Sequence, residues 1–227
     1  MRRWNTARVL TAALSWTHRT LSRIDPKALA IFVVGVFGVL VVIGAIRIAG
    51  DYDWRRFDLD QERTVPATFS GLVLLLAVIT AFTLACLDRS LPIFGITAVL
   101  WWMGFDEVIA IHERVQVTTG ITWQILYLPA LPFVIWFFVR GIPELPPPPR
   151  ARQFFIWGMY AWIASQVLDV IQNKGGGDLV IPALVPPEEF LEVIGSTLFA
   201  AALLLAVQAR PVRGAERART QPELTPR

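Results

Sequence analysis

The sequence predicts an all-α membrane protein with six transmembrane helices, and three observations support this fold class. The chain has 227 residues, of which 55% are hydrophobic and only 17% are charged; soluble domains usually carry about a quarter charged residues. Its apolar residues form six stretches, each long enough to cross a hydrocarbon core of ~30 Å as a helix. The sequence lacks the alternation of apolar and polar residues that predicts a β-barrel. Helices are therefore expected to satisfy the backbone hydrogen bonds within the bilayer.

These stretches divide the chain into a transmembrane domain at 28–208, a basic leader at 1–27 and a disordered basic cytoplasmic tail at 209–227. The expected spans are 28–49, 66–87, 91–115, 121–140, 152–173 and 187–208. The first span is longer than a signal-peptide core and no small-residue cleavage site follows it. The fourth is expected to bend at Pro129 and Pro132.

The leader mixes arginines with Val9, Leu10 and Trp16, which is typical of a short amphipathic segment at a membrane surface. A disordered basic leader is the alternative. With the N-terminus inside, 15 Lys and Arg residues fall on the cytoplasmic side and 6 on the other. The positive-inside rule therefore places both termini in the cytoplasm and predicts a multi-pass protein of the cell (inner) membrane. The basic tails favour a membrane surface over nucleic acid as a partner.

The sequence argues against several kinds of site. Cys86 is the single cysteine, so an intrachain disulfide is impossible. The sequence contains no Cys/His cluster of the kind that would indicate a structural zinc site. Haem is disfavoured because His18 lies in the leader, which leaves no second axial histidine within the bundle.

Three acidic residues adjoin apolar runs of equal length. Leu91–Phe105 precedes Asp106, Phe154–Leu168 precedes Asp169, and Val193–Val207 follows Glu192, each run having 15 residues. At 1.5 Å per residue, each run covers about 22 Å, which is too short to span the core alone. We therefore expect the three acids at one depth, in a chamber that opens toward the outer face.

A second polar tier is expected nearer the outer surface, formed by His112, Glu113, Gln172, Asn173, Glu188 and Glu189. On an unbroken helix, Asp106 and Glu113 lie about 20° apart and share a face. His112 and Glu107 lie on opposite sides of Asp106, so both cannot point inward. As candidates to point into the chamber, helical phase therefore ranks Asp106 and Glu113 first, and His112 ahead of Glu107.

This composition predicts a divalent-metal site, because buried carboxylates must take up protons, pair with bases or bind a cation. The candidate ligands are Asp106, His112, Glu113, Asp169, Glu188, Glu189 and Glu192, with Glu107 and Gln172 as secondary candidates. One imidazole among oxygen donors suits Fe, Mn, Mg or Ca, with Zn also possible. Such a metal could serve a membrane metalloenzyme acting on a lipid or small amphiphile. No catalytic side chain is predicted.

Two segments carry a resemblance. FDEVIAIHERV at 105–115 and EEFLEVIGSTL at 188–198 resemble a pattern of uncharacterised bacterial multi-pass membrane proteins, Asp-Glu-x4-His-Glu-Arg with Glu-Glu-x2-Glu-x2-Gly. The resemblance covers two short stretches. It implies that the acids of both segments form one set, and it implies no activity.

Two alternatives to a metal site remain open. The same acids could relay protons in a proton- or cation-coupled transporter or channel. Against this, the apolar runs offer few polar steps, at most Thr97, Ser165, Gln166, Ser196 and Thr197. The chain could also be a non-catalytic subunit of a larger membrane complex, with carboxylates that lock helices together. Acids in the first turn after Pro186 and Pro187 need no site, because the helix dipole favours them.

Overall fold

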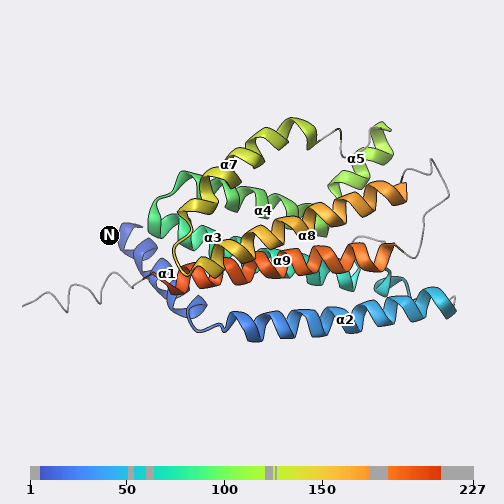
Figure 1. Ribbon diagram of the computed structural model, residues 1–227, viewed down its shortest axis with the longest axis horizontal. Coiled ribbons are helices and arrows are strands. Elements are labelled where there is room, and N and C mark those ends of the chain that lie inside the picture. Colours follow the sequence, from blue (N-terminus) through green and yellow to red (C-terminus); the bar gives the residue numbers. More distant parts are fainter. Residues whose placement is uncertain are drawn as a thin grey trace, which may run out of the picture.

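The computed structural model describes residues 6–50, 54–59, 64–120, 125, 127–173 and 184–210, and these contain helices and no strand. Figure 1 shows the arrangement. The elements are α1 (Thr6–Leu21), α2 (Pro26–Gly50), the 3-10 turn η1 (Arg55–Phe57), α3 (Val65–Asp88), α4 (Leu91–Ile109), α5 (Ile111–Thr119), the 3-10 turn η2 (Leu128–Ala130), α7 (Leu131–Glu144), α8 (Pro149–Asn173) and α9 (Val185–Gln208).

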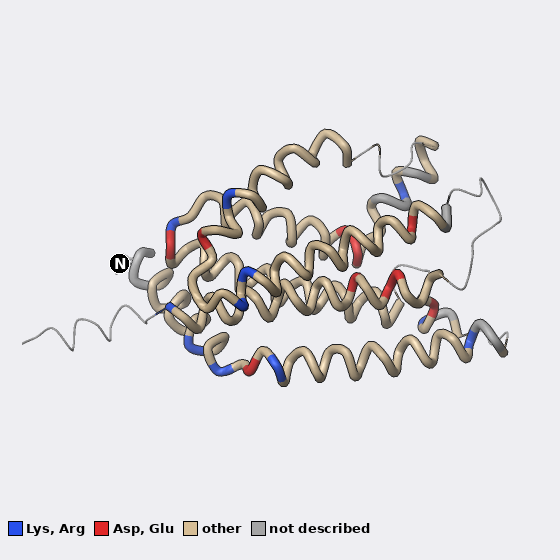
Figure 2. The backbone as a smooth tube through the Cα atoms, viewed as in Figure 1, with Lys and Arg blue, Asp and Glu red and all other residues tan. Residues whose placement is uncertain are grey.

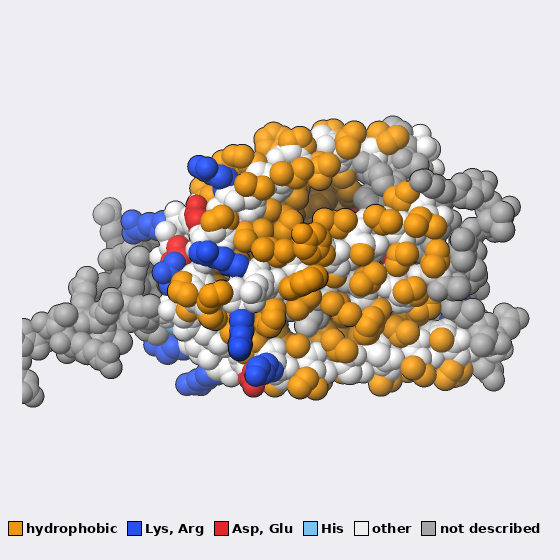
Figure 3. Space-filling model, in the orientation of Figure 1, with side chains coloured by type: hydrophobic (Ala, Val, Ile, Leu, Met, Phe, Trp, Pro, Cys, Tyr) orange, Lys and Arg blue, Asp and Glu red, His pale blue; other side chains and the backbone are white. Residues whose placement is uncertain are grey.

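Five of these helices, α2, α3, α4, α8 and α9, are long and apolar enough to cross a membrane. Large hydrophobic side chains on their outer faces stay exposed, such as Ile31 on α2, Leu72 on α3 and Trp157 on α8. Hydrophobic atoms cover much of the face between the two ends of the bundle, whereas Lys and Arg gather near one end (Figure 3). The fold is therefore that of a multi-pass membrane protein, and the first, second, fifth and sixth predicted spans correspond to α2, α3, α8 and α9.

The third predicted span is broken, contrary to the expectation of one helix over 91–115. Ala110 ends α4 in the left-handed conformation with φ of 58°, and its N–H donates to the Asp106 carbonyl oxygen at 2.7 Å. This hydrogen bond closes the helix as a C-terminal cap usually does. The next helix, α5, begins at Ile111. The expectation that Asp106 and Glu113 share a face assumed one unbroken helix, and the helix is broken between them.

The fourth predicted span is also not one continuous helix. Its described part consists of η2, α7 and the two helical residues Ile125 and Tyr127 before them, and α7 has 14 residues, which is about 21 Å of helix. Pro129 lies in η2 and Pro132 at the start of α7. Each proline lacks the N–H that an uninterrupted helix needs, so the prolines stand where the helix begins anew. Residues 121–124 and 126 lie outside the described residues.

The core of the bundle forms where α9 packs against α8, α3 and α2. The ring centroids of Phe155 on α8 and Phe199 on α9 lie 4.8 Å apart, and both side chains are almost fully buried. A Cβ atom added at Gly158 would lie 2.9 Å from the Gly195 carbonyl oxygen, so α8 and α9 approach backbone to backbone. Small residues permit such close approach of helices within membranes.

Both ends of the described chain lie together. The His18 Nε2 atom on α1 is 3.2 Å from the carbonyl oxygen of Val207 and 3.1 Å from that of Arg210. Gln208 donates through Nε2 to the Ile24 carbonyl oxygen at 2.7 Å. We call this end, which carries α1 and the end of α9, the terminal end of the bundle. Most of the basic residues in Figure 2 gather there, and the acidic positions of α4, α8 and α9 lie toward the opposite end.

Candidate acidic site

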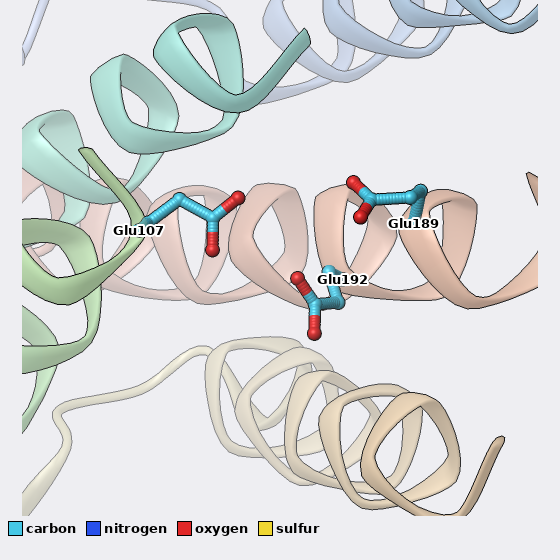
Figure 4. Close-up of side chains that lie close together, drawn as sticks. All are labelled: Glu107, Glu189 and Glu192. Atoms are coloured by element: carbon cyan, nitrogen blue, oxygen red, sulfur yellow. The ribbon is translucent and has the colours of Figure 1, made fainter. Parts of the chain in front are cut away.

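Three glutamates from two helices form an acidic cluster. Glu107, Glu189 and Glu192 each contribute one carboxylate oxygen, and these oxygens all lie within 4.8 Å of one another. Figure 4 shows the three side chains around a common space between α4 and α9. Glu192 is buried, with 8% of its surface exposed, while Glu107 and Glu189 are half-buried. We call these three residues the acidic cluster.

Local helix structure accounts for the placement of the two α9 residues. Pro186 and Pro187 occupy the first turn of α9, where their missing N–H groups cost little. Glu189 and Glu192 follow at a spacing of three, which places neighbouring side chains on one face of a helix. The third member, Glu107, stands three residues before Ala110, in the last turn of α4. The early end of α4 thus sets a carboxylate opposite the start of α9.

The amide of Gln166 on α8 holds the most buried member of the cluster. Its Nε2 atom donates to Glu192 Oε1 at 2.9 Å, and a hydrogen bond to a carboxylate is stronger than one between neutral groups. One turn deeper, Trp162 donates through Nε1 to the Ser196 hydroxyl oxygen at 3.2 Å. Two polar contacts therefore join α8 to α9 here, and the one from Gln166 orients Glu192.

Asp106 is adjacent to Glu107 in sequence but makes a different contact. The Tyr127 hydroxyl donates to Asp106 Oδ2 at 2.9 Å, and only 8% of Asp106 is exposed. The Trp102 ring packs edge-on against the Tyr127 ring, with centroids 6.0 Å apart. Consecutive helical residues point about 100° apart. Asp106 thus connects the end of α4 to the segment before η2, while Glu107 belongs to the cluster.

The other predicted ligands have separate places. Asp169 is half-buried in the last turns of α8, and Glu188 is half-buried in the first turn of α9; neither is among the three clustered carboxylates. His112 and Glu113 lie in α5, and Gln172 lies near the end of α8. The side chains of these three residues lie outside what the structure describes, so their roles stay predictions.

Two contacts of the site were not anticipated as such from the sequence. Gln166 precedes Asp169 by three residues and so shares the polar face of α8, which is a usable sequence signal. Tyr127 carries no comparable signal, because it lies in an apolar stretch 21 residues after Asp106. The contact of Tyr127 with Asp106 depends on the tertiary fold, which brings the segment before η2 next to the end of α4.

The cluster is suited to holding positive charge. Two ionised carboxylates separated by 4.8 Å repel by ~3 kcal/mol at an effective dielectric constant of about 20. Sharing a proton, pairing with a base or binding a cation relieves this repulsion. The three clustered donors are all oxygens, the donor type that Mg²⁺, Ca²⁺ and Mn²⁺ prefer.

Comparison with known proteins places the chain in a family. No curated protein and no solved structure matches it significantly. The model of a family described as a domain of unknown function (DUF8692) matches residues 28–207, from near the start of α2 almost to the end of α9. Because this match covers most of the chain and the whole acidic cluster, the chain belongs to the DUF8692 family.

Proposed function

We propose that this chain is an integral membrane protein that binds a divalent cation through Glu107, Glu189 and Glu192. The observation that carries the proposal is the gathering of three carboxylate oxygens from α4 and α9 within 4.8 Å, toward one end of a bundle whose core is mostly hydrophobic. Ionisable groups at such positions are costly and usually functional. A divalent cation would offset the mutual repulsion of the carboxylates and join α4 to α9.

The donor set narrows the choice of cation. Carboxylate oxygens alone favour Mg²⁺, Ca²⁺ or Mn²⁺ over Zn²⁺ and Fe²⁺, which bind well to imidazole or thiolate ligands. The half-buried positions of Glu107 and Glu189 leave room for water or a ligand oxygen beside the cation. A bound cation would polarise a carbonyl or phosphoryl oxygen. We therefore extend the proposal to chemistry on a lipid or small amphiphile.

We also propose that the chain crosses the cell membrane six times, with both termini in the cytoplasm. In Figure 1, α4 and α8 both start at the terminal end, so the chain between them must return, and α7 runs in the returning direction. The ends of the described chain also lie together, as the contact of His18 with Val207 shows. The orientation is supported by the division of Lys and Arg along the sequence, 15 on the expected cytoplasmic side against 6 on the other.

Cation binding can be tested on detergent-purified protein after chelation. Titration with Mn²⁺, Ca²⁺ and Mg²⁺ by calorimetry, together with melting curves, should show saturable binding and a rise in Tm. Glu192→Gln and Glu107→Gln should each weaken binding at least about tenfold, by analogy with the loss of other ligand-sphere contacts. Glu188→Gln is the matched control, because it removes an acid from the start of α9 that is not one of the three clustered carboxylates.

Two results would reject the proposal. One is the absence of saturable binding by the native protein for all three cations. The other is an equal loss of affinity in Glu188→Gln and Glu192→Gln, because binding would then depend on total charge and not on the cluster.

Proton transport receives less support from the contacts of the described residues. The hydroxyls of Thr97 and Thr197 donate to carbonyl oxygens one turn back, those of Ile93 and Val193. The Ser165 hydroxyl donates to the Trp162 carbonyl oxygen in the same way. A proton relay from the acidic cluster to the terminal end would need these hydroxyl groups. Each of them instead donates its hydrogen bond within its own helix.

A further inference from the structure

The helix α1 is fixed to the terminal end of the bundle by one face. His18 and Leu21 are each only 4% exposed, and α1 packs against α3 and α9. The His18 ring contacts two carbonyl oxygens at the C-terminus of α9. Next to this contact, Arg210 pairs with Asp88 at the end of α3, with 2.6 Å between nitrogen and oxygen. The orientation of α1 relative to the bundle is therefore set by specific contacts.

The opposite face of α1 is apolar and exposed. Val9 and Trp16 lie seven residues apart and so within about 20° of each other, whereas Trp16 and His18 point about 160° apart. Trp16 is 64% exposed and Val9 is 50% exposed, and Leu10 beside them is 60% exposed. Exposed apolar residues on an amphipathic helix favour insertion into the interfacial layer of a membrane, and Trp is enriched at that depth.

Basic side chains continue from α1 into α2. Arg19, Arg23 and Lys27 are exposed and follow each other at a spacing of four across the turn that joins these helices. The terminal end carries further exposed bases on α7, α8 and the α3–α4 turn: Arg89, Arg140, Arg150 and Arg152. The acids that the structure describes at this end are Asp25, Asp88 and Glu144, of which Asp88 is engaged by Arg210 and Glu144 accepts a hydrogen bond from Ser90. The exposed bases outnumber these acids. The surface is thus complementary to negative charge, and each base near an anionic membrane contributes about 1 kcal/mol.

We infer that α1 binds the anionic surface of the same bilayer that holds the bundle, with Val9 and Trp16 in the headgroup layer and Arg19, Arg23 and Lys27 against lipid phosphates. The chain itself favours this occupant, because α2, a candidate membrane span, begins at Pro26, five residues after Leu21. That short connection keeps α1 at the membrane surface. The inference uses no residue of the acidic cluster, and α1 lies outside the segment that matches the family.

The test uses the full chain in nanodiscs that hold one copy each. Cys86 is the single cysteine, so Cys86→Ala with Trp16→Cys, or with Val9→Cys, carries one environment-sensitive fluorophore. In discs of mixed phosphatidylcholine and phosphatidylglycerol, its emission should shift to the blue and be quenched by lipids with a headgroup-level nitroxide. In phosphatidylcholine alone, or at high salt, both effects should be smaller because the charge attraction is lost or screened.

Matched charge variants separate this surface from charge in general. Arg19→Gln with Arg23→Gln should require a higher fraction of phosphatidylglycerol for the same blue shift. Arg56→Gln with Arg114→Gln removes two exposed bases away from α1 and should leave the shift unchanged. An aqueous, unquenched probe at both positions overturns the inference. So does a probe shielded from water without nitroxide quenching, which indicates a protein partner, and so does an equal response of the two double variants.

Discussion

The two halves of the bundle are held together in different ways. In the apolar half, near the terminal end, rings such as Phe155 and Phe199 are fully packed and helices touch at Gly158 and Gly195. In the acidic half, helices end early or restart, and side-chain hydrogen bonds such as that of Tyr127 with Asp106 connect them. Because lipid tails are as apolar as leucine, helices in a bilayer associate through close packing and polar contacts. Close packing at small residues serves both halves, as at Gly71 on α3 and Gly104 on α4, and the acidic half adds side-chain hydrogen bonds between its interrupted helices.

This difference explains how a protein can keep an acidic cluster within a membrane bundle. Packed helices in the apolar half hold α8 and α9 at a fixed distance, so the side chains of Gln166 and Glu192 meet without a soluble domain to support them. The acidic half can then contain interruptions such as Ala110 without loss of the fold. If the two halves are independent in this way, substitutions in each should have different consequences.

The largest effect is expected from a glycine in the apolar half. Gly158→Val would place a Cβ 2.9 Å from both the Gly195 carbonyl oxygen and the Phe199 ring, and overpacking of this kind costs about 1–3 kcal/mol or more. Melting in detergent should show a drop in Tm. Gly38→Val on α2, where nothing lies within 4 Å of the added Cβ, is the control. Equal Tm values for the two variants would contradict close packing as the main stabilising contact.

A smaller loss is expected from the polar contact of the acidic half. Tyr127→Phe removes the hydroxyl that donates to Asp106, a carboxylate that is 8% exposed. Loss of a donor to a buried charged group costs about 1–3 kcal/mol. Tyr160→Phe, at a residue that is 59% exposed on α8, should leave the Tm almost unchanged. If both variants melt like the native protein, hydrogen bonding does not connect α4 to the segment before η2.

The cost of replacing alanine by glycine should distinguish the helix break from a helix interior. Ala110→Gly places glycine where φ is 58°, which relieves about 1 kcal/mol of left-handed strain and offsets the loss of a buried methyl group. Ala77→Gly, in the middle of α3 and fully buried, should destabilise by about 1 kcal/mol or more. Comparing the two Tm changes tests whether Ala110 ends α4: similar losses would mean that α4 continues through this position.

The smallest effect is expected at the surface of the terminal end. Arg210→Gln breaks the ion pair with Asp88. The Arg210 side chain is 37% exposed and the Asp88 side chain is 18% exposed. Partly exposed pairs contribute about 0.2–1 kcal/mol, and salt weakens them. The difference in Tm from the native protein should therefore shrink as salt is added. A Tm difference that is large and does not change with salt would contradict the expectation that this exposed ion pair contributes little.

Hydrophobic length made much of the fold predictable. The expected spans 28–49 and 66–87 agree with α2 and α3 to within two residues, because a membrane crossing needs ~20 consecutive apolar residues. The breaks at Ala110 and before α7 could not be found this way. Alanine is the best helix former, and prolines occur inside many continuous transmembrane helices, so neither residue type marks the end of a helix by itself.

The candidate site was partly predictable for the same reason. Equal apolar lengths drew attention to Asp106 and Glu192, because a carboxylate so close to the hydrocarbon core is costly. The apolar lengths could not tell which of the neighbours Asp106 and Glu107 joins the cluster. Helical phase, which assumed an unbroken helix, had ranked Glu107 last. The end of α4 at Ala110 and the return of the chain through Tyr127 direct these two side chains to different partners.

The sequence by itself determined that this is a helical membrane protein with acids near one end of its spans, since hydrophobic length and the cost of buried charge act on each segment separately. Which carboxylates meet was decided by tertiary structure alone. Glu107 and Glu192 are 85 positions apart, and their distance depends on how α3, α4, α8 and α9 pack, on the left-handed residue that ends α4, and on the amide of Gln166. These are relations between helices, and no single segment encodes them.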